Sequence, residues 1–202
     1  MKRIVVLICS VFLGACSTLG VKQNCAKQDL KTMSYFAEGQ RLAAFRFVAQ
    51  ARGYQADGIL QVKEVAEGAY EVTAFATAGA MRLMTATVNK KGVNFTYVLP
   101  LADHAVVRGK VETFLKALLF PPQEIKSCRT DGAVQTVQAD GGNYRYPAGQ
   151  VYPSLLIYKK TLGSVTLAYD QYAPYEQGQV AHYLRYQDGG IEAEMVLISL
   201  KK

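Results

Sequence analysis

The sequence contains few of the residues that build catalytic and metal centres. Its 202 residues include two histidines, four cysteines and no tryptophan. His104 and His182 lie far apart without a serine or carboxylate motif beside them, so we assign them structural roles. Glu192 and Glu194 share one face of a predicted strand and could act as an acid–base pair, but a solvated outer face is the simpler interpretation. No metal-ligand cluster or phosphate-binding glycine loop is present, so we predict a protein that is not an enzyme and has no cofactor.

Long apolar runs and low-complexity tracts are also absent. The apolar segment from Ile4 to Leu13 is about half the ~20 residues that a bilayer-spanning helix needs. Half of the residues are hydrophobic and 19% are charged, which is a globular composition. The net charge of +7 comes from no dense basic run, which argues against nucleic acid as a partner. Such a mild excess of positive charge favours contact with anionic lipid surfaces.

The N-terminus has the pattern of a secreted lipoprotein. Lys2 and Arg3 precede the apolar segment, and Leu13-Gly14-Ala15-Cys16 follows it, with small residues before the cysteine as a signal peptidase requires. This stretch resembles the lipobox of bacterial lipoproteins, in which the cysteine is acylated and the bond before it is cut. An ordinary signal peptide cut near Ala15 is the alternative.

The lipobox implies an address for the mature protein. Residues 1–15 would be a signal peptide, and Cys16 would carry palmitate or a similar acyl group that binds membrane lipid. Ser17 is not the aspartate that retains lipoproteins in the inner membrane, so we expect an outer-membrane anchor with the domain facing the periplasm. Residues 16–41 would form a lipidated tether, and 42–202 a single domain, which we expect to be monomeric.

The remaining mature cysteines are Cys25 and Cys128. An oxidising periplasm makes a disulfide between them the default expectation, and it would pin the N-terminal segment to the domain. Two unpaired thiols are the alternative.

Ten segments alternate between apolar and polar residues, as strands with one buried face do. The first begins at Leu42, and the others are Gly58–Val65, Tyr70–Thr77, Met81–Val88, Val93–Leu99, Ala133–Gln138, Val151–Lys159, Gly163–Tyr169, Val180–Gln187 and Ile191–Leu200. Tight turn signals between them indicate antiparallel pairing. The sequence therefore predicts a mainly β fold, an unclosed and strongly curved antiparallel barrel of about 10–11 strands.

One amphipathic helix interrupts the strands. Its apolar residues recur at helical spacing: Val107, Val111, Phe114, Leu115 and Leu118. We predict Asp103 as its N-cap, with Arg108, Lys110 and Lys116 turned away from the sheet. Pro121-Pro122 ends it, and its apolar side should pack on the concave face of the sheet. Leu30, Met33, Tyr35 and Phe36 suggest a second, weaker helix within the tether.

The lipobox, the meander from Leu42 to Leu99, the helix ending at Phe120-Pro121-Pro122 and the strands up to Ile198 together resemble the LolA and LolB proteins. The resemblance is nearest to LolB-like outer-membrane lipoproteins of unassigned function. It implies a half-barrel whose apolar cavity accepts acyl chains beneath a helix. The implied lining consists of inward-facing residues, namely Phe45, Phe47, Val72, Leu83, Phe95, Tyr97, Phe114, Leu118, Leu167 and Tyr169. LolB has a projecting loop with an exposed leucine between its third and fourth strands, whereas the matching turn here is Ala78-Gly79-Ala80.

Two functions follow from this pattern. The first is an outer-membrane lipoprotein that binds or transfers acyl chains or lipidated cargo. The second is a structural or adaptor lipoprotein of the cell envelope whose sheet is filled by its own side chains. Conversion of a glycolipid or acyl substrate is a third possibility. The tyrosines between Tyr144 and Tyr186 fit either a lipid-contacting lining or ordinary strand packing.

Overall fold

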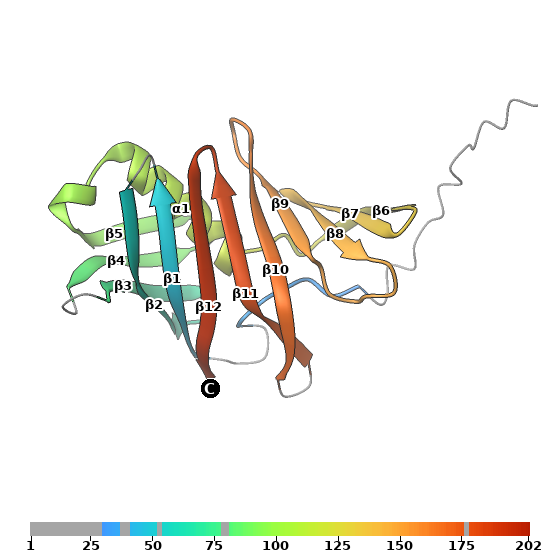
Figure 1. Cartoon of the computed structure of the whole chain (residues 1–202), viewed down its shortest axis with the longest axis horizontal. Coiled ribbons are helices and arrows are strands. Elements are labelled where there is room, and N and C mark those ends of the chain that lie inside the picture. The colour runs from blue at the N-terminus through green and yellow to red at the C-terminus, as the bar shows by residue number, and fades with distance from the viewer. Residues whose placement is uncertain (1–29, 37–40, 52–53, 78–80, 176–177) are drawn as a thin grey trace, which may run out of the picture.

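The computed structural model describes residues 30–36, 41–51, 54–77, 81–175 and 178–202. Its elements in chain order are β1 (Leu42–Ala51), β2 (Tyr54–Ala66), β3 (Ala69–Ala76), β4 (Arg82–Asn89), β5 (Gly92–Val98), η2 (Pro100–Ala102), α1 (Ala105–Leu119), β6 (Ile125–Asp131), β7 (Val134–Ala139), β8 (Gly142–Pro147), β9 (Leu155–Lys159), β10 (Ser164–Tyr175), β11 (Gly178–Asp188) and β12 (Ile191–Lys201). Figure 1 shows one curved sheet, with α1 behind β1 and β12.

All of these strands belong to a single antiparallel sheet with the order β5-β4-β3-β2-β1-β12-β11-β10-β9-β8-β7-β6. The first and last strands of the chain, β1 and β12, therefore lie side by side at the centre of the sheet. The first meander, β1 to β5, extends from them to one edge, and the second meander, β6 to β12, extends to the other. The edge strands β5 and β6 do not pair with each other, which leaves the barrel open. The predicted fold, a curved and unclosed antiparallel sheet with a helix, is confirmed.

Two strands lie outside the ten predicted segments. β6 is an edge strand with mostly exposed residues and no continuous apolar face, so alternation could not reveal it. β8 follows the turn at Asp140–Gly141 and carries only two large inward side chains, Tyr144 and Tyr146, both fully buried.

Local irregularities give the sheet its curvature. The register shifts between Ala44 and Phe45 in the β1–β12 pair and between Thr85 and Ala86 in the β4–β5 pair. Such bulges bend a strand and increase its twist. Gly58 marks a close approach within β2, because a Cβ atom there would lie 1.9 Å from the carbonyl oxygen of Phe75.

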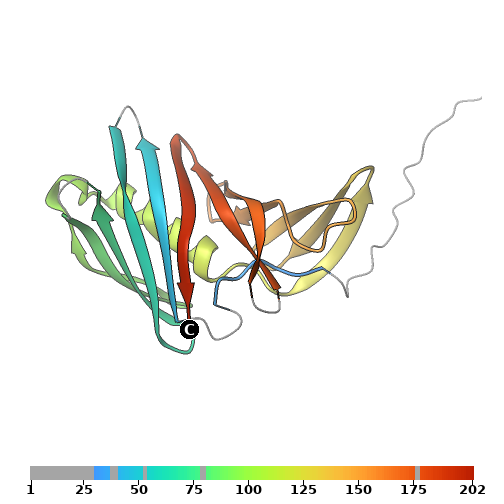
Figure 2. The same ribbon diagram turned by 60° about the horizontal axis from the view of Figure 1, so that its bottom comes forward.

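α1 crosses one face of the sheet (Figure 2). Leu115, Leu118 and Leu119 bury its C-terminal half in the main core. The predicted cap is wrong: the N-cap is His104, and its side chain makes no capping hydrogen bond. Asp103 instead accepts hydrogen bonds from Arg108, at 2.6 Å from Nε and 3.0 Å from Nη2.

The described part of the tether, residues 30–36, is not helical. Its side chains alternate, with Met33 and Tyr35 buried in the core. The Lys31 amide donates to the Val151 carbonyl at 2.8 Å, and the Tyr35 hydroxyl donates to the Ala181 carbonyl at 2.7 Å. Because these partners are supplied by the domain, tertiary contacts hold the segment extended against a weak helical pattern.

Candidate functional site

An apolar cavity of about 280 Å³ lies between the sheet and the N-terminal half of α1. It is surrounded by the five strands of the first meander, β1 to β5, by β11 and β12, and by η2 and α1. Its lining consists of Phe47, Ala49, Ala51, Ala56, Leu60, Ala74, Leu83, Met84, Phe95, Val98, Ala102, Val107, Arg108, Lys110, Val111, Phe114, Tyr186, Ile191, Ala193 and Met195. Almost all of these side chains are apolar, so the cavity suits a hydrocarbon ligand.

Small side chains on three adjacent strands create the space. In the sheet register, Ala49 of β1 lies between Ala56 of β2 and Ala193 of β12. Earlier on the same face of β1, Ala43 lies between Val62 and Leu200. A row of three methyl groups cannot fill the distance to the helix, whereas branched neighbours close the sheet around Ala43, which is fully buried.

The other half of the sheet is filled. Its inward side chains are large and completely or almost completely buried: Tyr144, Tyr146, Leu156, Leu167, Tyr169 and Leu184. The tether adds Tyr35, whose ring meets that of Phe45 edge-on at 5.1 Å. The concave face is therefore a packed core on one side and a cavity on the other.

α1 is likewise divided into a buried C-terminal half and a more exposed N-terminal half. Leu115, Ala117 and Leu118 are buried, but the first two turns of α1 are exposed or half-buried. Phe114 stands at the boundary, with its ring 5.1 Å from that of Tyr186 in an edge-on arrangement. The N-terminal half of α1 thus stands away from the sheet and roofs the cavity.

Two cationic side chains of α1 border the cavity. Arg108 forms a two-point ion pair with Asp103 and lies over the ring of Phe95, 5.5 Å from its centroid. The hydrogen bond from Arg108 lowers the pKa of Asp103 below its ordinary value. This pair is balanced, with one charge of each sign.

Lys110, predicted to face away from the sheet, instead reaches the β11–β12 turn. Its ammonium lies 2.7 Å from Oδ1 of Asp188, and that of Lys160 lies 2.5 Å from the same atom. Burial alone would raise the pKa of Asp188, but hydrogen bonds and charge from the two lysines hold it below its ordinary value. Tyr186 completes the cluster, with its hydroxyl 3.3 Å from Oδ2 of Asp188.

The residues predicted to line an acyl cavity divide into three groups. Phe47, Leu83, Phe95 and Phe114 do line this one. Five others are buried or form part of the packed core: Phe45, Val72, Leu118, Leu167 and Tyr169. That the first group contacts lipid stays a prediction.

Tyr97 forms the third group, because it is 39% exposed and lies outside the lining. Thr85 pairs with Tyr97 and Ala86 with Phe95, so Thr96 is an extra residue in β5. A bulge of this kind reverses the alternation that follows it. Val98 therefore faces the cavity in place of Tyr97.

Sequence reasoning did not single out the alanines or Tyr186 as lining residues. The alanines were visible as inward positions of predicted strands, but their importance depends on which strands are neighbours. Most tyrosines of the second meander serve packing, and their hydroxyls donate to backbone carbonyls: Tyr144 to Pro122 at 2.8 Å, Tyr146 to Lys31 at 3.2 Å and Tyr172 to Pro153 at 2.5 Å. Tyr186 alone among the tyrosines of the described chain lines the apolar cavity.

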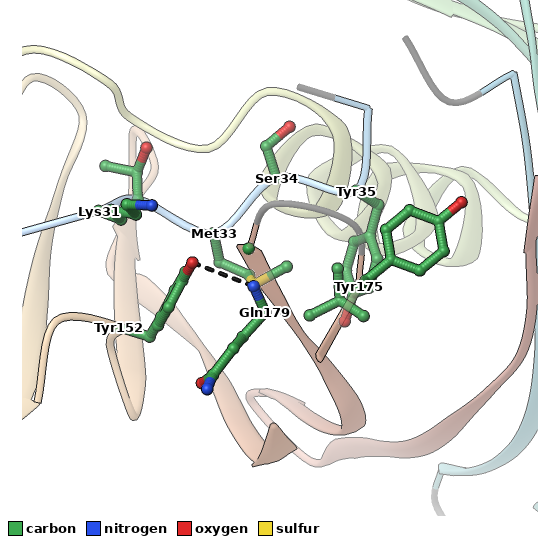
Figure 3. A pocket seen from close by; sticks show the side chains of 10 residues that line it. Lys31, Met33, Ser34, Tyr35, Tyr152, Tyr175 and Gln179 are labelled. Atoms are coloured by element: carbon green, nitrogen blue, oxygen red, sulfur yellow. Dashed lines mark hydrogen bonds between the residues drawn. The ribbon is translucent and has the colours of Figure 1, made fainter. Parts of the chain in front are cut away.

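A smaller pocket of about 110 Å³ lies beside the tether (Figure 3). Lys31, Ser34 and Gln179 make its lining partly polar, and the backbone amide of Gln179 donates to the Tyr152 hydroxyl at 3.0 Å. Its size and its polar wall distinguish it from the apolar cavity.

Four apolar side chains are exposed at the end of the barrel where β1 ends and α1 begins. Tyr54 opens β2, Met81 precedes β4, Leu101 lies in η2, and Val106 lies in the first turn of α1. Leu101 and Tyr54 are the most exposed, at 87% and 82%. The cavity residues Ala102 and Val107 directly follow two of them in the chain, which places an apolar rim beside the cavity.

The two glutamates considered as an acid–base pair lie away from the cavity. Glu194 lies on the outer face with its carboxylate 3.4 Å from Arg185, and Glu192 beside it is exposed. Within the residues that the structure describes, no three histidine, cysteine or acidic side chains could share a metal ion. Among the same described residues, no helix is long and apolar enough to cross a bilayer.

Two of the predicted covalent sites, Cys16 and Cys25, lie outside the described residues. The turn 78–80, which was compared with the projecting loop of LolB, lies outside them too. Cys128 is half-buried in β6. Lipidation and the disulfide stay predictions.

The fold is shared with a protein of known structure, although no similar sequence identifies it. No family model matches the sequence, and no curated protein does. Among solved structures, a LolA superfamily protein from Nitrosomonas europaea superposes with a TM-score of 0.56 at 10% identity, over 82% of this chain and 87% of that one. The fold is LolA-like.

Two further structures superpose less closely. One is a domain from Vibrio parahaemolyticus named for outer membrane lipoprotein sorting, with a TM-score of 0.43, 12% identity and coverage of 81% of this chain and 85% of that one. The other is a DUF1329 family protein from Desulfovibrio piger, with a TM-score of 0.43, 6% identity and coverage of 83% and 87%. The LolA-like fold predicted from the arrangement of elements is thus established by the Nitrosomonas europaea structure.

Proposed function

We propose that this protein is an outer-membrane lipoprotein that binds an acyl chain in the cavity beneath α1 and passes it on without chemical change. The observation that carries the proposal is the unfilled apolar cavity of about 280 Å³. It is roughly twice the ~150 Å³ of an engineered apolar cavity that stays dry and binds benzene. A space of this size in a sheet otherwise packed with large side chains fits a hydrocarbon guest.

The volume sets the length of chain that fits. If a methylene occupies the ~30 Å³ of a water molecule, the cavity holds roughly nine methylenes. Each buried methylene contributes about 0.8 kcal/mol, so each should tighten binding about fourfold.

The lining supports carriage and not conversion. Its polar groups are those of Arg108, Lys110 and Tyr186, and the first two are held in ion pairs with aspartates. None of these pairs places an activated nucleophile against the apolar wall. The exposed rim of Tyr54, Leu101 and neighbouring side chains offers an apolar contact for a membrane or cargo.

The location is proposed from the sequence and the fold together. A LolA superfamily fold and an N-terminal lipobox both suit a protein of the bacterial envelope. Acylation of Cys16 would hold the domain at the periplasmic side of the outer membrane. Replacement of Cys16 by alanine should move the folded protein from the membrane fraction to the soluble periplasmic fraction; a variant that stays in the membrane fraction contradicts the anchor.

The cavity is tested with straight-chain alcohols of six to sixteen carbons, measured by calorimetry on protein purified without detergent. Affinity should rise about fourfold per methylene up to roughly nine and then level off. Ala193→Phe should abolish binding because Ala193 lines the cavity. Val196→Phe on the same strand is the matched control, since Val196 is 42% exposed on the other face.

Native ligand is sought by lipid extraction and mass spectrometry of the same preparation, with near-stoichiometric acyl species expected. Absence of bound lipid, together with no dependence on chain length or on Ala193→Phe, would refute the proposal and favour an adaptor lipoprotein.

A further inference from the structure

Two ammonium groups share one carboxylate oxygen at the border of the apolar cavity. Lys110 of α1 and Lys160, which follows β9, both contact Oδ1 of Asp188, at 2.7 Å and 2.5 Å. The Asp188 side chain is 2% exposed, whereas the two lysines keep 23% and 25% of their side-chain surface. The carboxylate is enclosed, and the cations are open to a ligand.

The cluster carries one positive charge in excess. Within the described chain, the ion pairs of Lys110 and Lys160 are made with Asp188 alone. Like charges held against one oxygen repel each other, and a second anion beside them would reduce that repulsion. Arg108, the other cation of the lining, differs because Asp103 balances it one to one.

The excess charge lies beside the apolar wall of the cavity. Lys110 belongs to the cavity lining, so its aliphatic stem faces the apolar space while its ammonium reaches Asp188. Tyr186 and Ile191, which flank the Asp188 turn, line the cavity as well. Apolar wall and cationic pair therefore adjoin in the way that the tail and head of an amphiphile do.

We propose that the ligand is a single-chain amphiphile with an anionic head group, whose tail fills the cavity and whose head contacts Lys110 and Lys160. This inference rests on the proposed function, because it names the chemical class that the acyl-binding cavity selects. A carboxylate or a phosphate offers the oxygen acceptors that two ammonium groups can share.

The test compares three ten-carbon probes on the full protein: decanoate, decyl phosphate and decanol. Calorimetry should show that Lys110→Gln weakens decanoate or decyl phosphate about tenfold more than it weakens decanol. Affinity for the anions should fall with added salt, and that for decanol should not. The anion that loses more affinity on substitution identifies the head group as carboxylate or phosphate.

Lys116→Gln is the matched control. Lys116 lies on the same helix, pairs with Glu112 at 2.7 Å and does not line the cavity, so its removal should leave all three probes unchanged. Lys160→Gln provides a second variant that keeps the Lys110–Asp188 pair, and urea unfolding verifies that each variant is folded.

Equal affinity for decanol and both anions, with equal effects of Lys110→Gln on all three, would overturn the head-group inference and leave the acyl-binding proposal standing. No binding of any probe would instead refute acyl binding itself.

Discussion

Replacement of Ala49 by leucine tests whether the space beneath α1 is unfilled. Leucine adds three carbons to a position that lies between Ala56 and Ala193 and faces a cavity of about 280 Å³. At about 0.8 kcal/mol per buried methylene, these carbons contribute up to ~2.4 kcal/mol. Fixing the leucine rotamer costs about 0.5–1 kcal/mol. We therefore expect Ala49→Leu to raise the free energy of unfolding by about 1.5 kcal/mol.

Ala43 gives the matched control on the same face of the same strand. It is fully buried between Val62 and Leu200, so Ala43→Leu should overpack the core and lower stability by about 1–3 kcal/mol. Urea unfolding of lipid-free protein, followed by circular dichroism, measures both variants. The two substitutions are thus predicted to have opposite signs. If Ala49→Leu destabilised the protein as Ala43→Leu does, the cavity would not be free space and the reasoning would be refuted.

Three further predictions concern the helix, the buried carboxylate and the cysteines. Gly109→Ala should stabilise the protein by about 0.5–1 kcal/mol in a thermal melt, because nothing lies within 4 Å of the added methyl group; no gain would show that α1 does not persist as a helix there. Asp188→Asn should cost about 3 kcal/mol at pH 7 by leaving two lysines without their partner. Since the folded pKa of Asp188 is lowered, its stabilisation exists above the ordinary aspartate pKa of about 4 and disappears as the pH falls through the folded value. The gap between Asp188→Asn and the wild type should thus close in acid, and a gap independent of pH would contradict the ion pair. Unfolded, unreduced mature protein should show no reactive thiol at Cys25 or Cys128, whereas two labelled thiols would exclude the disulfide.

The fold was predictable because most of its strands show a local alternation of apolar and polar residues. Period-two patterns from Leu42 onward gave the first meander, and one helical stripe gave α1. β6 was hidden because an edge strand with mostly exposed side chains has no apolar face to repeat. Residues 30–36 suggested a helix because their apolar positions fit a short stripe, but carbonyl and amide partners on the domain hold them extended.

The cavity was only partly predictable, because its position depends on neighbours across the sheet. Alternation placed Phe47 and Phe95 on the inner face, yet one extra residue at Thr96 turned Tyr97 outward. The row of alanines becomes visible only once β1 is known to lie between β2 and β12. Lys110 and Asp188 are 78 residues apart, a distance in sequence that no local pattern bridges.

The limited volume of the cavity gives the exposed apolar rim beside it a function in binding a long chain. Roughly nine methylenes at about 0.8 kcal/mol contribute about 7 kcal/mol, half of what a sixteen-carbon chain would gain from complete burial. Part of that gain is offset by the freedom lost on binding, so such a chain would be held loosely enough to leave again. The remainder of the chain would emerge near the end where Leu101 and Val106 are exposed. We infer that these side chains cover it there, and that Leu101→Asp would weaken a sixteen-carbon ligand while leaving an eight-carbon ligand unaffected.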